Sequence, residues 1–110
     1  MTRAEFEALV AEALDGIPDE FARYLENVSV LVEDEPEEDD DLYGLYDGVP
    51  LSERTHDFAA PPDRIFIYRG PLVRDFRSRR AIKRQIRITI VHEIAHFFGL
   101  DERRIRRLGY

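Results

Sequence analysis

The sequence contains no cysteine, and its only methionine is Met1. Without cysteine the chain can form no disulfide bond and can offer no thiolate to a metal ion, so any metal must be bound by histidine, aspartate or glutamate. The sequence also lacks the run of roughly 20 apolar residues that a membrane-spanning helix needs. The first ten residues carry glutamates where an export signal has an unbroken apolar core. We therefore expect a cytoplasmic protein that does not contact a membrane.

Basic residues are scarce in the first 63 residues, which contain 19 acidic and three basic side chains and a net charge of −16. Residues 64–110 contain four acidic and 13 basic side chains, a net charge of +9, and the whole chain has a net charge of −7. The basic run in this second part comprises Arg74, Arg77, Arg79, Arg80, Lys83, Arg84 and Arg87. Such a basic run is a feature of surfaces that bind nucleic acid, so nucleic acid is one candidate partner. The acidic first part favours internal charge pairing instead, and we expect no nucleic-acid partner.

The length of 110 residues and the apolar content of 44% are typical of one globular domain, which we place at residues 1–110. Thr2 and Glu5 form a capping-box pattern, which predicts an N-terminal helix that ends at Gly16. Pro18 favours the start of a second, shorter helix. The chain therefore opens with two helices.

Three later segments are expected to form strands. β-branched and apolar residues predict strands at residues 27–32 and 64–69, and residues 42–50 suggest a short strand followed by a turn. Gly70 and Pro71 should end the strand at 64–69. These strands predict a small sheet.

The last third of the chain is predicted to be helical. From Ile82 to Ile94 an isoleucine recurs every four residues, which predicts a long helix that begins between Asp75 and Arg79. A short terminal helix should follow Gly99. The elements together predict an α+β fold with N-terminal helices, a small mixed or antiparallel sheet packed on the long helix, and a short C-terminal helix.

Residues 33–41 contain eight carboxylates and one proline. Such a block repels itself and is typical of a solvated, mobile loop, so a simple connector is one interpretation. A second hypothesis is a lid, since acidic residues can be attracted to the basic run on the long helix and lie over it.

The eight residues HEIAHFFG, from His92 to Gly99, form the pattern H-E-x-x-H-x-x-G. His92 and His96, four residues apart on a helix, project from adjacent turns and can bind one metal ion. Glu93 lies beside that metal and can take a proton from a zinc-bound water. Gly99 allows a sharp turn where the helix ends. The alternative is a core helix that carries these residues without a metal, but an ionised glutamate is costly to bury without a site to serve.

A catalytic zinc site normally has three protein ligands, and the motif supplies two. The third ligand in one zincin arrangement lies six residues after the second histidine, where this chain has Glu102. Asp101 is the neighbouring candidate, although aspartate also suits the N-cap of the helix that follows. His56, the remaining histidine, is a further alternative in a polar segment. The spacing favours Glu102.

With HEIAHFFGLDE preceded by RIFIYR, and LYGLYDGVPLSER further upstream, the chain resembles the compact bacterial zincin-like metallopeptidases. The resemblance implies a minimal zincin fold, zinc as cofactor, His92 and His96 as ligands, and Glu93 as general base. In that family an acidic residue, usually aspartate, stands where this chain has Glu102. The family also resembles metzincins in its glycine turn, but Met1 cannot supply a Met-turn.

Two functions follow from these expectations. The first is a zinc-dependent peptidase whose peptide or protein substrate pairs with an exposed edge of the strand at residues 64–69. Tyr68, Tyr110 or a basic side chain would then steady the oxyanion. The second is a zincin-derived module that binds peptides or proteins without cleaving them. The small size of the chain favours this alternative.

Overall fold

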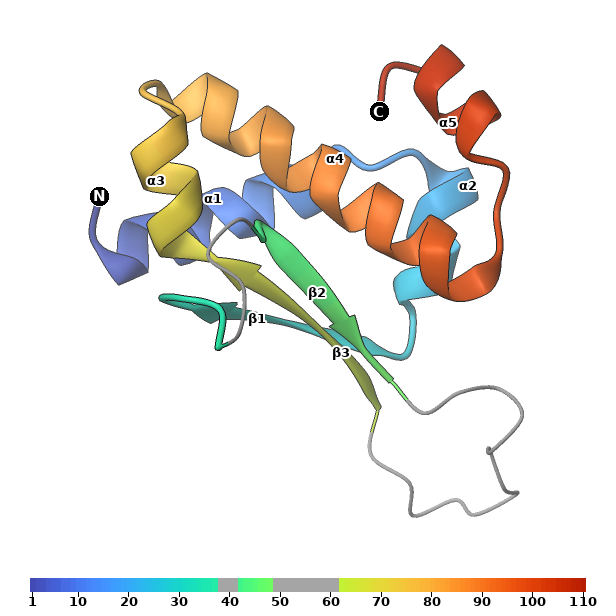
Figure 1. The fold of residues 1–110 in the computed structure, drawn as a ribbon, viewed down its shortest axis with the longest axis horizontal. Helices are drawn as coiled ribbons and strands as arrows, with labels where there is room; N and C mark the ends of the chain where they lie inside the picture. Colours follow the sequence, from blue (N-terminus) through green and yellow to red (C-terminus); the bar gives the residue numbers. More distant parts are fainter. Residues whose placement is uncertain (38–41, 49–61) are drawn as a thin grey trace.

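The computed structural model describes residues 1–37, 42–48 and 62–110. Its elements in chain order are α1 (Arg3–Asp15), α2 (Asp19–Ala22), the 3-10 helix η1 (Arg23–Leu25), β1 (Val28–Glu33), β2 (Gly44–Asp47), β3 (Asp63–Tyr68), α3 (Arg69–Asp75), α4 (Arg79–Phe98) and α5 (Glu102–Arg107). The long helix α4 passes across the small sheet with α1 beside it (Figure 1). The predicted α+β fold is confirmed.

The sheet has three strands in the order β1-β3-β2. β1 is parallel to β3, and β2 is antiparallel to it, so the sheet is mixed. Ile65 of β3 is therefore paired on one side with Val30 and on the other with Tyr46. The prediction that residues 64–69 offer an exposed edge is wrong, because both sides of β3 are occupied by neighbouring strands. The outer strand that contacts α4 is β2.

The core lies between the sheet and the two longest helices. The predicted apolar face of α4 is confirmed, since its four regularly spaced isoleucines are buried together with the inward residues of α1 and β3. The fully buried side chains of this core include Phe6, Leu9, Ile65, Ile67, Leu72, Ile86, Ile90 and Ile94. Burial of each such side chain stabilises the fold by roughly 1.5–3 kcal/mol before entropy is counted.

The helix α3 was not predicted from the sequence. Gly70 and Pro71 do follow the end of β3, but they stand in the first turn of α3 and do not break the chain into a loop. Proline is tolerated in a first helical turn because its missing N–H would have no partner inside the helix there. Leu72 of this helix is fully buried, so tertiary packing favours the helix at this position.

The N-terminal helix begins as its capping pattern predicts. The backbone N–H of Glu5 donates to the hydroxyl of Thr2 across 3.2 Å, and Gly16 forms the other end of α1. The end of α1 is also tied to α4, because Nε of Arg87 donates to the carbonyl of Ala13 across 3.0 Å. A positive side chain suits this end of a helix, where carbonyl groups lack partners within the helix.

Charge pairing between the acidic and basic parts of the chain is present in the structure. Exposed ion pairs include Arg79 with Glu12, Arg64 with Asp47, Arg69 with Asp34, Arg74 with Glu35 and Arg104 with Glu20. Exposed pairs of this kind contribute about 0–1 kcal/mol each. They connect segments far apart in the sequence and give two members of the basic run, Arg74 and Arg79, intramolecular partners.

The acidic segment 33–41 is only partly described. Glu33 ends β1, and Asp34 and Glu35 pair with arginines of α3. Residues 38–41 lie outside the described part of the chain, so the mobility of this segment and its role as a lid stay predictions. In the described ranges, no helix is both long and apolar enough to cross a membrane.

Candidate metal centre and active site

The motif occupies the last two turns of α4 and the turn that follows. Gly99 closes the helix with φ of 69° and ψ of 35°, in the left-handed region, and its N–H donates to the carbonyl of Ala95. Glycine adopts this conformation without the strain that a Cβ would cause. The chain then reverses into α5, which begins at Glu102. The predicted glycine turn thus returns the next acidic residues toward the end of α4.

The two histidines project from successive turns of α4, as their spacing predicts. Their ring centroids are 6.4 Å apart, and the ring planes are inclined by 61°. His92 is half-buried, whereas 62% of the His96 side chain is exposed. One side of the pair is therefore open to solvent, and a small ion or a substrate can reach it.

Glu102 and Asp101 have different surroundings. Oε1 of Glu102 contacts Nε2 of His96. The side chain of Asp101 instead accepts a hydrogen bond from the backbone N–H of Arg103 across 3.0 Å and forms the N-cap of α5. Glu102 thus lies beside one of the two histidines, whereas Asp101 has a helix-capping role. His56 lies outside the described residues.

The donor set suits zinc in its chemistry, because two imidazoles and one carboxylate are a common catalytic set for this ion. Among the residues that the structure describes, no three such side chains are gathered closely enough to hold a metal ion. In the structure Glu102 contacts His96 directly, and the ring centroids of His92 and His96 are 6.4 Å apart. Joint binding of a metal by the three side chains requires this direct contact to give way.

Glu93 is half-buried and connected to the sheet. Its Oε2 accepts a hydrogen bond from the backbone N–H of Tyr46 across 3.2 Å. Burial raises the pKa of Glu93 above its ordinary value, while the Tyr46 N–H and the charges of His96 and His92 act in the opposite direction. A carboxylate with a raised pKa is a better proton acceptor than a carboxylate with an ordinary pKa.

Tyr46 is a component of the site that the sequence did not reveal. Its ring stacks on Phe97 with centroids 4.1 Å apart and contacts the edge of Phe98 at 6.0 Å. Its hydroxyl donates to Asp63 across 2.6 Å. These contacts hold β2 against the end of α4, so the N–H that reaches Glu93 is fixed in position.

Gly44 lets β2 approach α4. A Cβ at this position would lie 2.7 Å from Cγ2 of Thr89 and 2.9 Å from the carbonyl oxygen of Phe66. Both distances are shorter than ordinary contacts, so a side chain here would push the strand away from the helix or from β3. The absence of a side chain therefore supports the contact between Tyr46 and Glu93.

The two tyrosines considered for the oxyanion differ in their surroundings. Tyr68 is buried at the end of β3, and its pKa is raised by that burial and by nearby carboxylates, among them Glu93. The ring of Tyr110 packs edge-on against Phe21 with centroids 6.0 Å apart. Within the described ranges, neither phenol makes a hydrogen bond to the motif.

No curated protein matches the chain at a significant level. The family of zincin-like metallopeptidases matches it over residues 25–110. This range begins at the end of η1 and contains the whole sheet, α4 and α5. It also contains every residue of the candidate site. The chain therefore belongs to the zincin-like metallopeptidase family.

Proposed function

We propose that this protein is a zinc-dependent peptidase that uses Glu93 as its general base. One observation carries the proposal: the Glu93 carboxylate is held by the Tyr46 N–H of the outer strand, next to two histidines on the open side of α4. This arrangement joins a proton acceptor to a strand edge that can bind a peptide. Membership of a metallopeptidase family agrees with a hydrolytic role.

His92, His96 and Glu102 are the residues that we assign to zinc. Bound zinc would polarise the peptide carbonyl and lower the pKa of a water molecule to about 7. The contact of Glu102 with His96 supports this set over one that contains Asp101, which serves as a helix cap.

Glu93 would move protons in the reaction. Its carboxylate accepts a proton from the attacking water and passes it to the nitrogen of the departing amine. The hydrogen bond from Tyr46 orients the carboxylate, and its partly buried position raises its pKa and so its affinity for that proton. Tyr46 is thus a positioning residue for Glu93.

The substrate would pair with β2. Alternate residues of an antiparallel strand direct their N–H and C=O groups to the same side. The carbonyl of Tyr43 accepts from Tyr68 of β3, whereas the N–H of Tyr46 is directed at Glu93. Gly44 therefore directs its backbone groups away from β3, toward the edge where an extended peptide can add a strand.

The proposed function is tested by a digest of a peptide mixture followed by mass spectrometry. The zinc-loaded protein should cleave peptides, a chelator should abolish cleavage, and added zinc should restore it. Zinc binding with no cleavage of any peptide would support the alternative, a module that binds peptides without hydrolysing them. Equal cleavage with and without chelator would contradict a zinc-dependent reaction.

A further inference from the structure

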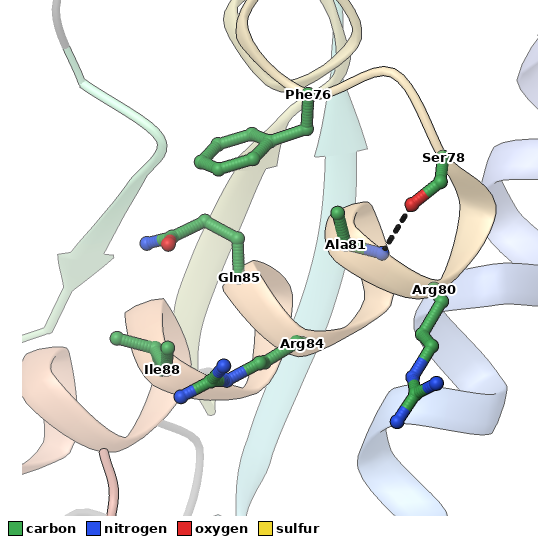
Figure 2. A pocket seen from close by; sticks show the side chains of 7 residues that line it. All are labelled: Phe76, Ser78, Arg80, Ala81, Arg84, Gln85 and Ile88. Carbon is green, nitrogen blue, oxygen red and sulfur yellow. Dashed lines mark hydrogen bonds between the residues drawn. The ribbon is translucent and has the colours of Figure 1, made fainter.

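A pocket of about 410 Å³ lies at the junction of α3 and α4. Its lining comes from the turn between the two helices and from the first half of α4 and comprises Phe76, Ser78, Arg80, Ala81, Arg84, Gln85 and Ile88. In Figure 2, Phe76 and Gln85 extend to the same side, and the Arg84 side chain extends toward Ile88. The volume lies in the range of sites that hold small ligands.

The pocket lies on the face of α4 that carries the histidines. Since each helical residue turns by about 100°, Ala81, Gln85 and Ile88 lie within about 40° of the direction of His92. With a rise of about 1.5 Å per residue, the pocket residues on this face lie between about 6 Å (Ile88) and about 16 Å (Ala81) from His92 along the helix. An extended peptide covers about 3.3 Å per residue. The pocket is thus two to five residues away from a bond held at the motif.

The pocket also adjoins the start of β2. The ring of Phe76 contacts Tyr43, which precedes β2, with centroids 5.6 Å apart. The side-chain amide of Gln85 donates to the hydroxyl of Thr89 across 3.3 Å, and Thr89 lies against Gly44. The same outer strand therefore connects the pocket with the candidate site.

The direction of β2 determines which part of a substrate reaches the pocket. Gly44 lies beside Thr89, and Tyr46 contacts Glu93, so β2 and α4 run in the same direction. Antiparallel pairing of strands is the more stable arrangement per residue. A peptide antiparallel to β2 would place the residues C-terminal to the cleaved bond toward the start of β2 and hence toward the pocket.

The lining of the pocket combines apolar and positively charged side chains. Phe76, Ala81 and Ile88 supply apolar surface. Arg80 and Arg84 are exposed and, among the residues that the structure describes, have no ion-pair partner. Two polar side chains near these arginines already take part in hydrogen bonds. The hydroxyl of Ser78 accepts from the N–H of Ala81 across 3.0 Å, while Asp75 next to the pocket accepts from Tyr43 across 2.5 Å.

We propose that this pocket binds an acidic side chain of the substrate, two to five residues C-terminal to the cleaved bond, and that Arg84 is its main charged partner. An aspartate or glutamate side chain has an apolar stem and a carboxylate end, which match the apolar and the positively charged residues of the lining. Arg84 is preferred over Arg80 because Arg84 extends toward Ile88, the end of the pocket nearer the motif (Figure 2). The inference rests on the proposed peptidase function.

The test uses alanine-based decapeptides that carry one leucine and, three residues after it, glutamate or glutamine. Binding to the zinc-loaded protein is followed by NMR shifts of the Gln85 side-chain amide, and cleavage by mass spectrometry. The glutamate peptide should bind roughly fivefold more tightly than the glutamine peptide, and Arg84→Gln should remove this difference. Lys83→Gln is the matched control, since Lys83 carries the same charge on α4 but does not line the pocket.

Loss of the preference in Arg84→Gln alone would support the subsite. Equal loss in Lys83→Gln would overturn it, because general attraction to a basic helix would then explain the effect. A preference only for acids placed before the leucine would also overturn it. Cleavage of both peptides with equal efficiency would reject the subsite but leave the peptidase function in place. An Arg84-dependent binding preference without cleavage would retain the pocket and contradict the peptidase function.

Discussion

The backbone N–H of Tyr46 donates a hydrogen bond to the carboxylate of Glu93 across 3.2 Å, although the two residues are 47 positions apart in the sequence. This contact joins the outer strand of the sheet to the helix that carries the motif. It holds the proposed general base at the edge where we expect a peptide to bind. In the proposed function, this contact connects the strand that binds the substrate with the residue that transfers the proton.

Substitution of Gly44 tests the importance of this contact. Gly44→Ala should lower the free energy of unfolding by roughly 1–3 kcal/mol, because the added methyl group would collide with Thr89 and with the backbone of Phe66. It should also reduce peptidase activity without loss of zinc, since Tyr46 would move away from Glu93. Denaturant unfolding, metal analysis and a cleavage assay measure these effects. Leu45→Ala, at a side chain that is 41% exposed, is the control and should change stability far less.

Metal content tests the two histidines. The purified protein should bind about one zinc ion per chain, and His96→Ala should lose it. A chelator should lower the melting temperature of the wild type, because the ion binds the folded state in preference to the unfolded one. His56→Ala should keep its zinc. Equal zinc in the wild type and His96→Ala, or loss of zinc in His56→Ala, would show that the ligand assignment is wrong.

The third ligand is tested by two neighbouring substitutions. Glu102→Ala should weaken zinc affinity far more than Asp101→Ala in a competition titration, because Glu102 contacts His96. Asp101→Ala should instead destabilise the metal-free protein by about 1 kcal/mol, through loss of the N-cap of α5. The reverse order of zinc affinities would assign the ligand to Asp101.

The anchoring of the acidic segment predicts a pH effect. Hydrogen bonding to Arg74 lowers the pKa of Glu35 below its ordinary value of 4.5, in spite of some desolvation. The contribution of this pair to the free energy of unfolding should be present at pH values above the pKa that Glu35 has in the unfolded chain. It should be lost as the pH falls through the lower pKa of the folded state.

An NMR titration of the Glu35 carboxyl measures this effect. Arg74→Gln should raise the pKa of Glu35 toward 4.5. Arg77→Gln, an exposed cation of the same basic run that has no ion-pair partner among the described residues, should leave it unchanged. An equal shift in both variants would mean that the net charge of the region controls this carboxyl, and not the pair.

Local sequence patterns predicted most of the elements and the motif. The capping box at Thr2, the spacing of the isoleucines in α4 and the turn at Gly99 depend on residues close in the chain, and all three were predicted correctly. The preferred ligands and the general base that the motif predicted lie within the eleven positions from His92 to Glu102. Their proximity follows largely from helix geometry and one glycine turn.

Features that depend on distant segments were missed. The apolar pattern of β3 indicated a strand but contained no information on its neighbours, so its central position was not foreseen. The helix α3 was missed because Gly70 and Pro71 resemble a break, whereas the burial of Leu72 favours a helix. The hydrogen bond from Tyr46 to Glu93 was missed because it forms only when β2 packs on α4. Tertiary packing decided each of these features.

The proposed reaction is tested most directly by zinc-loaded Glu93→Gln. Glutamine keeps the shape of the side chain and can still accept the hydrogen bond from Tyr46, but it cannot take a proton from water. We predict that the variant retains about one zinc ion per chain and the fold, and that its rate of peptide cleavage falls at least about 100-fold relative to the wild type. Cleavage at the wild-type rate by the zinc-loaded variant would contradict the account.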